Sequence, residues 1–185
     1  MKKITLGFLT AAAAIVLNSV SATANETTLT KGQTVQIVFE KTGGRTVQPP
    51  KVTARLLSQS VRYNAQGTLQ KVRFELRNRG RRTLNLDQIS SQMSIIARGK
   101  TQTMQSQFIW WVPRGRTSGK LSPKKTRRFS IAFGGKLDSS IEHWNPEIKG
   151  SRAATFLKLS ITEPAKKSLI AWRTFLRLPV VRIVK

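Results

Sequence analysis

The residue types of a nucleophilic triad occur together in one short stretch, which holds Asp138, Ser139, Ser140 and the only histidine, His143. A catalytic triad is assembled in space from a nucleophile, a base and an orienting acid, so closeness along the chain does not indicate one. The chain also lacks the G-x-S-x-G turn that exposes the serine of one large class of hydrolases. We therefore expect these residues to form the turns of a surface loop, and we expect no catalytic residue and no enzyme activity.

Carboxylate pairs and metal sites are equally poorly supported. Glu142 and Glu147 could act together on a glycosidic bond, but Lys149 and Arg152 lie nearby and favour ion pairs instead. The chain has no cysteine and a single histidine, which excludes thiolate metal sites and histidine clusters within one chain. The sequence therefore predicts neither a metal nor any other cofactor.

Basic side chains give the strongest signal. The chain carries 33 Lys and Arg against 8 Asp and Glu, a formal net charge of +25. Such an excess destabilises a folded chain by self-repulsion unless counter-ions or a partner offset it, so a polyanionic partner is favoured over a merely solvated face. The candidate polyanion-binding residues fall in clusters: Arg77, Arg79, Arg81, Arg82, Arg114, Arg116, Lys120, Lys124, Lys125, Arg127 and Arg128.

The paired tryptophans Trp110 and Trp111 stand next to this basic material. Adjacent residues of a strand point to opposite faces, so one indole should pack inside and the other should face outward. We predict Trp111 as a stacking platform beside Arg114 and Arg116, because aromatic faces with adjacent cations suit sugars and bases. The alternative is that a loop or a long arginine stem covers the outer indole.

The elements that must position these residues follow an alternation of apolar and polar residues, which is typical of half-buried strands. The clearest example is 70–78, with Val72, Phe74 and Leu76 on one face and charged residues on the other. The predicted strands are 34–40, 51–61, 70–78, 83–89, 92–97, 103–112, 127–133, 154–162 and 174–184. Residues 169–172 are predicted as a short helical turn.

Turn-forming residues separate these runs, and two segments, 113–125 and 134–152, are too long for tight turns. No amphipathic helix is evident. The sequence predicts an all-β fold: a single antiparallel immunoglobulin-like β-sandwich of about 7–9 strands with two long loops. A β-barrel is the alternative.

Two stretches carry a resemblance to a known class of domain. Residues 71–86 read KVRFELRNRGRRTLNL, and residues 121–133 read LSPKKTRRFSIAF. Together they resemble the scheme of exported bacterial immunoglobulin-like domains, among them the N-terminal domains of periplasmic pilus chaperones. The resemblance covers about a third of the chain and implies the fold. These chaperones have two such domains, and we expect the 161 residues after the predicted cleavage to leave no room for a full second one. The cleft Arg/Lys pair of the chaperones is not assigned to positions of this sequence.

The N-terminus has the three parts of a secretory signal peptide: Lys2 and Lys3, an apolar stretch, and a small-residue exit ending in Ala22-Thr23-Ala24. We predict cleavage after residue 24. The alternative is a membrane anchor, but the apolar stretch is shorter than the roughly 20 residues that a span needs. The mature chain would keep 31 basic and 8 acidic residues, a net charge of +23.

The predicted organisation is a cleaved signal peptide (1–24), a flexible segment (25–33) and a β-sandwich domain (34–185). The predicted function is an exported, non-catalytic binding protein, periplasmic or secreted and not transmembrane after cleavage. Its partner would be a polyanion: envelope lipid head groups, acidic polysaccharide or nucleic acid without sequence specificity. The alternative is a chaperone-like or assembly protein that pairs an edge strand with an envelope protein.

Overall fold

Thirteen β-strands make up the regular secondary structure of the chain in the computed structural model, which describes residues 26–44, 48–64, 67–96, 107–110, 112–135, 151–164 and 169–184. The described residues contain no helix, and so none that is long and apolar enough to cross a membrane. The strands are β1 (Glu26–Thr28), β2 (Thr34–Gln36), β3 (Glu40–Gly43), β4 (Val52–Asn64), β5 (Gly67–Asn78), β6 (Leu84–Ile96), β7 (Gln107–Trp110), β8 (Val112–Arg114), β9 (Gly119–Leu121), β10 (Thr126–Gly135), β11 (Arg152–Pro164), β12 (Leu169–Arg177) and β13 (Val181–Val184).

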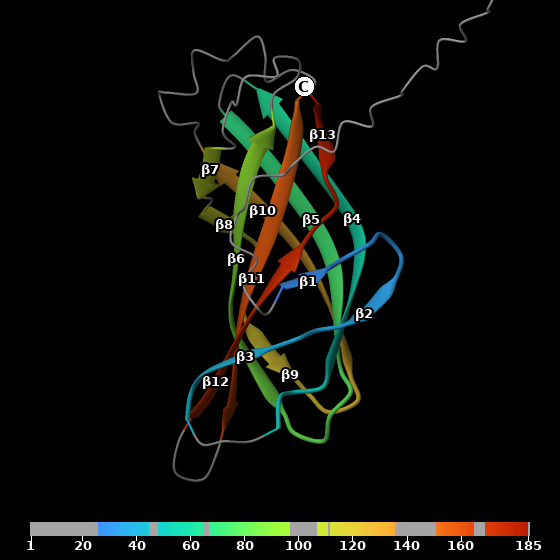
Figure 1. The fold of residues 1–185 in the computed structure, drawn as a ribbon, viewed down its shortest axis with the longest axis vertical. Helices are drawn as coiled ribbons and strands as arrows, with labels where there is room; N and C mark the ends of the chain where they lie inside the picture. Colours follow the sequence, from blue (N-terminus) through green and yellow to red (C-terminus); the bar gives the residue numbers. More distant parts are fainter. Residues whose placement is uncertain are drawn as a thin grey trace, which may run out of the picture.

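The strands form two layers that face each other (Figure 1). In one layer β11 lies between β6 and β12, with β7 and β9 on β6 and with β1 and β3 on β12. In the other layer β5 lies between β4 and β10, with β2 on β4 and β8 on β10. Strand β13 pairs with both β11 and β4 and joins the layers into one open sheet. We call them the β6–β11–β12 layer and the β4–β5–β10 layer.

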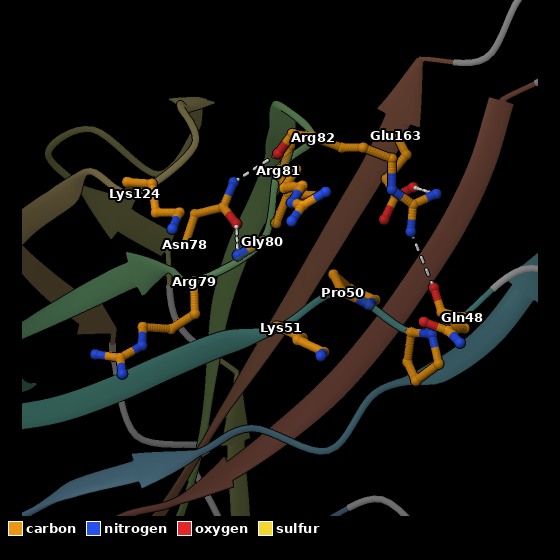
Figure 2. Close-up of a pocket in the computed structure, with 12 residues that line it drawn as sticks. Gln48, Pro50, Lys51, Asn78, Arg79, Gly80, Arg81, Arg82, Lys124 and Glu163 are labelled. Atoms are coloured by element: carbon orange, nitrogen blue, oxygen red, sulfur yellow. Dashed lines mark hydrogen bonds and ion pairs between the residues drawn. The ribbon is translucent and has the colours of Figure 1, made fainter.

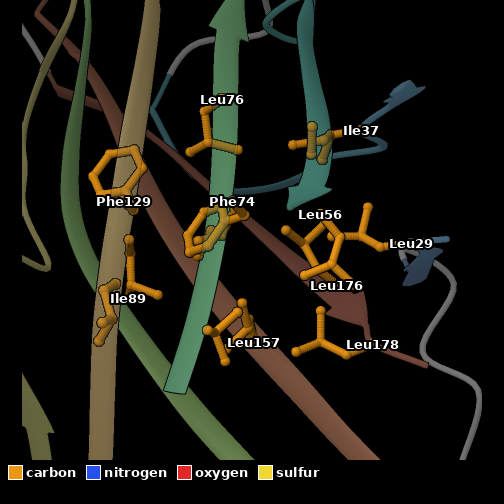
Figure 3. Packing of buried hydrophobic residues seen from close by; sticks show 14 of the residues in the cluster. Leu29, Ile37, Leu56, Phe74, Leu76, Ile89, Phe129, Leu157, Leu176 and Leu178 are labelled. Atoms are coloured by element: carbon orange, nitrogen blue, oxygen red, sulfur yellow. The ribbon is translucent and has the colours of Figure 1, made fainter. Parts of the chain in front are cut away.

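The hydrophobic core fills the space between the layers (Figure 3). Strand β5 alternates strictly, so that Val72, Phe74 and Leu76 point inward and are fully buried. The ring of Phe74 stacks on that of Phe129 from β10, with 5.2 Å between the ring centroids. Leu157 from β11 belongs to the same cluster. Burying a side chain of this size contributes about 1.5–3 kcal/mol. The inward apolar residues of the period-two pattern are therefore the main source of stability.

A small polar network crosses the core between the layers. Gln70 of β5 is fully buried, and its Nε2 donates a hydrogen bond of 2.8 Å to Oγ1 of Thr155 in β11. The hydroxyl of Ser91 in β6 donates to Gln70 Oε1, also at 2.8 Å. Both ends of the amide are thereby satisfied, which removes the penalty for burying it.

Most predicted strands are present, but several boundaries differ. The two strands predicted at 83–89 and 92–97 form one strand, β6, because buried Ser91 continues the inward face. The helical turn predicted at 169–172 is wrong, since these residues open β12, where Ile170 and Trp172 are buried and Leu169 is exposed. The strand predicted at 174–184 is divided between β12 and β13.

The prediction of a purely antiparallel sheet with 7–9 strands is also wrong. β1 pairs in parallel with β12, and β13 pairs in parallel with β4, so the sheet is mixed. The sheet order ends at β1 and β8, and no described pairing closes it, so the barrel alternative is not observed. All-β architecture is confirmed.

Two segments predicted to be irregular contain strands. The segment 25–33, predicted to be flexible, contains β1, and Leu29 within it is only 1% exposed. The first predicted long loop, 113–125, contains part of β8 and the whole of β9. The second, 134–152, lies almost wholly outside the described residues, as do His143 and the acidic and serine residues around it.

Candidate functional site

Asn78, the last residue of β5, holds two basic turns together at one end of the molecule. It occupies an inward position of the strand and is 1% exposed. Its Nδ2 donates to the backbone carbonyls of Arg82, at 2.7 Å, and Leu121, at 2.9 Å. Its Oδ1 accepts from Gly80 N, and its backbone N–H donates to Lys125 O. One buried amide therefore fixes the β5–β6 turn against the β9–β10 turn.

A pocket of about 340 Å³ opens between these turns and the segment before β4 (Figure 2). That segment is attached by a 2.7 Å hydrogen bond from Arg79 N to Lys51 O. We call this cavity the end pocket, and its lining is rich in cations: Gln48, Pro49, Pro50, Lys51, Asn78, Arg79, Gly80, Arg81, Arg82, Leu84, Lys124 and Glu163.

Glu163, near the end of β11, is the single acidic residue in the lining, and it is 2% exposed. Its Oε2 lies 2.6 Å from Nη1 of Arg82, whose other terminal nitrogen donates to Gln48 O at 3.1 Å. Burial raises the pKa of the Glu163 carboxyl, and the Arg82 charge acts in the opposite direction. Neither carboxylate oxygen has a hydrogen bond to the described residues, so the ion pair compensates the charge but leaves acceptor capacity unused.

The outer side of the β4–β5–β10 layer is a second cationic region. Along β5, Lys71, Arg73 and Arg77 alternate with the buried positions and are exposed. Arg55 of β4 and Arg128 of β10 flank Glu75 in the next cross-strand row, and Arg128 forms an ion pair with that carboxylate. We call these five cations, Arg55, Lys71, Arg73, Arg77 and Arg128, the basic face.

Small side chains flank the cations of β5 in this face. The cross-strand partners of Arg73 are Ser58 and Ser130. Those of Arg77 are Thr53 and Thr126, and those of Lys71 are Ser60 and Ala132. Directly opposed side chains are the closest neighbours in a sheet, so no bulky or acidic side chain stands directly opposite Lys71, Arg73 or Arg77. Arg73, Arg77 and Lys71 make no ion pair or side-chain hydrogen bond with the described part of the chain.

Arg127 has a structural role. Its Nη1 and Nη2 donate to the carbonyls of Lys120, at 3.1 Å, and Ser118, at 3.3 Å, and its guanidinium lies over the ring of Phe129. A Cβ at Gly119, whose φ is +137°, would collide with this guanidinium. Arg127 thereby fastens the β8–β9 segment to β10, and two of its five N–H donors are occupied by backbone carbonyls.

The structure brings together only part of the predicted polyanion-binding set. Arg79, Arg81, Arg82 and Lys124 line the end pocket, and Lys125 follows in the same turn. Arg77 and Arg128 belong to the basic face. Arg114 pairs with Ala132, which is also the cross-strand partner of Lys71, so Arg114 extends the Lys71 row beside the basic face. It lies six residues along β10 from Thr126, about 20 Å from the end-pocket turn at the usual strand rise. Arg116 and Lys120 lie on the segment that Arg127 fastens. Trp111 lies outside the described residues, so its predicted stacking role stays a prediction.

Sequence reasoning missed Lys51, Arg55, Lys71 and Arg73. The alternation in β5 already placed Lys71 and Arg73 on an outward face, but neither lies in a dense run of basic residues, which was the signal used. Lys51 joins the end pocket through a hydrogen bond to a residue 28 positions later, and nothing local in the sequence announces this contact. No cluster of metal-ligating side chains occurs among the described residues.

No protein-family model matches the chain, and no curated protein matches it in sequence. Solved structures similar to it include the ASH/PapD-like domain 7 of human CEP192, at a TM-score of 0.37 and 16% identity, covering 75% of this chain and 92% of that domain. They also include the sporulation control protein Spo0M of Bacillus subtilis, at a TM-score of 0.36 and 15% identity, covering 71% of this chain and 50% of Spo0M.

A PapD-like domain is thus among the similar structures. The similarity is restricted to the fold. Both TM-scores lie below 0.5.

Proposed function

We propose that this chain is an exported, non-catalytic binding protein that uses the basic face and the rim of the end pocket to hold a polyanion. The observation that carries the proposal is the series of exposed cations along strand β5, Lys71, Arg73 and Arg77. Serine, threonine and alanine flank these cations on the neighbouring strands, and one carboxylate, that of Glu75, interrupts the series. Alternate residues of a strand are about 7 Å apart, so this series forms a regular linear array of positive charge. An extended polymer with repeating phosphates or carboxylates matches such an array.

Export and location belong to the same proposal. The signal-peptide pattern of residues 1–24 supports a periplasmic or secreted protein. The two facing layers and their mainly antiparallel ladders support an immunoglobulin-like sandwich as the finer description of the fold. The candidate polyanions are the three named from the sequence: lipid head groups, acidic polysaccharide and nucleic acid bound without regard to its sequence.

The proposal is tested by the salt dependence of binding to heparin. Five phosphate-like contacts correspond to a slope of about −4 for log affinity against log salt concentration. We expect Arg73→Ser to reduce this slope by about one. The matched control is Lys41→Ser, which removes the same charge from an exposed site on β3 and should leave the slope almost unchanged. A slope near zero for the unmodified protein would refute the proposal.

One observation favours the alternative of edge-strand pairing. On the side of β10 away from β5, β8 pairs only with residues 132–134, and no described strand pairs with residues 126–131. Unpaired backbone groups of this kind can accept a partner's strand, although charged residues at an edge also discourage such pairing. A partner that stays bound in molar salt would support this alternative, because backbone pairing is weakly screened.

A further inference from the structure

The end pocket is larger than a site for a lone inorganic anion needs to be. Its volume of about 340 Å³ falls within the range of small-molecule sites, about 300–1,000 Å³. One water molecule takes about 30 Å³ in the liquid, so a single phosphate would leave much of the pocket to solvent. A complementary ligand therefore has a body as well as a charge.

The residues that line the pocket indicate the chemistry of the ligand's charged group and of its body. Five cationic side chains call for an anion of high charge density, and the forked donors of the three arginines match phosphate oxygens. These cations are Lys51, Arg79, Arg81, Arg82 and Lys124. Of the five, only Arg82 makes an ion pair within the described residues.

The environment of Glu163 favours a ligand with a hydrogen-bond donor. Glu163 is 98% buried and lines the pocket. Its Oε2 is paired with Arg82 Nη1 at 2.6 Å, whereas its Oε1 has no partner among the described residues. A buried acceptor without a partner is unfavourable, and a hydroxyl or amino group of a ligand would relieve this. Such a donor would also favour the ionised form of a carboxyl whose pKa is raised by burial.

We infer that the end pocket binds a phosphorylated sugar ring. The cations of the two turns and of Lys51 hold the phosphate, and Glu163 accepts a hydrogen bond from a ring hydroxyl or amino group. Arg82 positions the Glu163 carboxylate and closes that side of the pocket through Gln48 O. The inference deepens the proposed function and rests on it in requiring that the cations at this end of the molecule bind anions.

Calorimetric titration of the purified protein with glucose 6-phosphate, inorganic phosphate and glucose tests the inference. We expect glucose 6-phosphate to bind at least about tenfold more tightly than phosphate, because it gains the contact with Glu163. Glucose should show no measurable binding. Cyclohexylmethyl phosphate, which keeps the ring and the charge but has no hydroxyl, should bind no better than phosphate. That ligand tests the role of the donor without any change to the protein.

Two variants and a matched control assign the effect to residues. Glu163→Gln should reduce the advantage of glucose 6-phosphate over phosphate to below about threefold while phosphate still binds. Lys124→Ser should weaken both ligands, and Lys41→Ser, outside the pocket, should change neither. The inference is overturned if the unmodified protein binds the sugar phosphate and phosphate equally, or if cyclohexylmethyl phosphate binds as tightly as glucose 6-phosphate.

Vesicles distinguish a free sugar phosphate from the same group on a lipid. Phosphatidylinositol carries a hydroxylated ring on its phosphate, whereas phosphatidic acid at matched surface charge has none. Preferential binding to phosphatidylinositol that Glu163→Gln abolishes would support the inference and identify a lipid source. Equal binding to both vesicles, together with no preference for glucose 6-phosphate, would overturn it. Glu163→Gln should not weaken heparin binding, because it removes a negative charge and no cation, so failure of the sugar site and failure of polyanion binding are separate outcomes.

Discussion

The outer surfaces of the two layers carry arginines in different situations. On β12, Arg173 and Arg177 lie 3.0 and 3.5 Å from the carboxylates of Glu40 and Glu26, and each guanidinium also lies over a phenylalanine ring. On β5, Arg73 and Arg77 face serine and threonine and have no carboxylate partner among the described residues. The same residue type is therefore neutralised on one layer and left available on the other.

The distribution of acids produces this difference. Glu26, Glu40 and Asp87 serve the β6–β11–β12 layer, where Asp87 accepts a hydrogen bond from the Thr162 hydroxyl. The strands β4, β5 and β10 contain one acid between them, Glu75. A high net charge could be spread evenly as a solubility device. Among the described residues the acids are concentrated on the β6–β11–β12 layer, so the unpaired positive charge faces outward mainly from the β4–β5–β10 layer.

The largest effect is expected at the residue where the basic face meets the end pocket. Asn78→Ala removes three side-chain hydrogen bonds at a site that is 1% exposed. We expect the free energy of unfolding to fall by about 2–4 kcal/mol, measured by chemical denaturation. The variant should also lose sugar-phosphate binding more than heparin binding, since β5 itself stays paired on both sides. A loss below about 0.5 kcal/mol would show that Asn78 does not hold the turns.

Removing three positive charges from one layer or from the other tests directly whether the two layers differ in polyanion binding. The triple variant Lys71→Ser, Arg73→Ser, Arg77→Ser should lower heparin affinity by about 100-fold at 0.1 M salt, because three counterion-releasing contacts are lost. The matched triple variant Lys158→Ser, Arg173→Ser, Arg177→Ser removes the same charge from the other layer. We expect it to lower the affinity by less than about tenfold, since two of its cations are already paired. Equal losses would mean that net charge alone governs binding.

Removing the acid of the basic face should sharpen the contrast between the layers. Glu75→Gln releases Arg128 from its ion pair and leaves the array without a negative charge. We expect heparin affinity to rise by about three- to fivefold at low salt, and this gain to vanish at high salt because the charges are exposed and screened. A fall in affinity would indicate instead that Glu75 orients Arg128 for binding.

The smallest expected effect is a pH dependence that originates at Glu163. Because burial raises its pKa, the folded state holds this proton more tightly than the unfolded state, where the pKa of a glutamate is about 4.3. In the window from about pH 4.3 up to the raised pKa, the free energy of unfolding should fall as pH rises.

The neutral variant Glu163→Gln lacks this term, so its stability relative to the unmodified protein should increase as pH rises through the window. Thermal unfolding of both proteins between pH 4 and 7 measures the difference. A difference that does not vary with pH would contradict the assignment.

The sequence predicts the middle parts of β5, β10 and β11 well because buried apolar residues recur there at every second position, as with Val72, Phe74 and Leu76 in β5. It predicts β6 and β12 poorly where polar residues point inward. Ser91 is buried because Gln70, 21 positions away, receives its hydrogen bond, and Thr174 continues the inward face of β12. A local pattern cannot distinguish such a residue from one that ends a strand.

The same limit applies to the candidate site. The basic turns at 79–82 and 124–125 are visible as runs of Arg and Lys, but their proximity is created by Asn78 reaching Leu121, 43 residues away. Glu163 resembles any other acid near the end of a strand. Its significance comes from burial beside Arg82, and that contact joins residues from different strands.

The polar network of Gln70, Thr155 and Ser91 fixes the alignment of the two layers, in addition to filling space in the core. Apolar side chains alone could interdigitate in more than one alignment, whereas sliding one layer by a residue would strand a buried amide without partners. Alignment is thereby set from the inside. The outward residues of β5 do not set this alignment. They can therefore be replaced by anionic or neutral residues without a change in the fold.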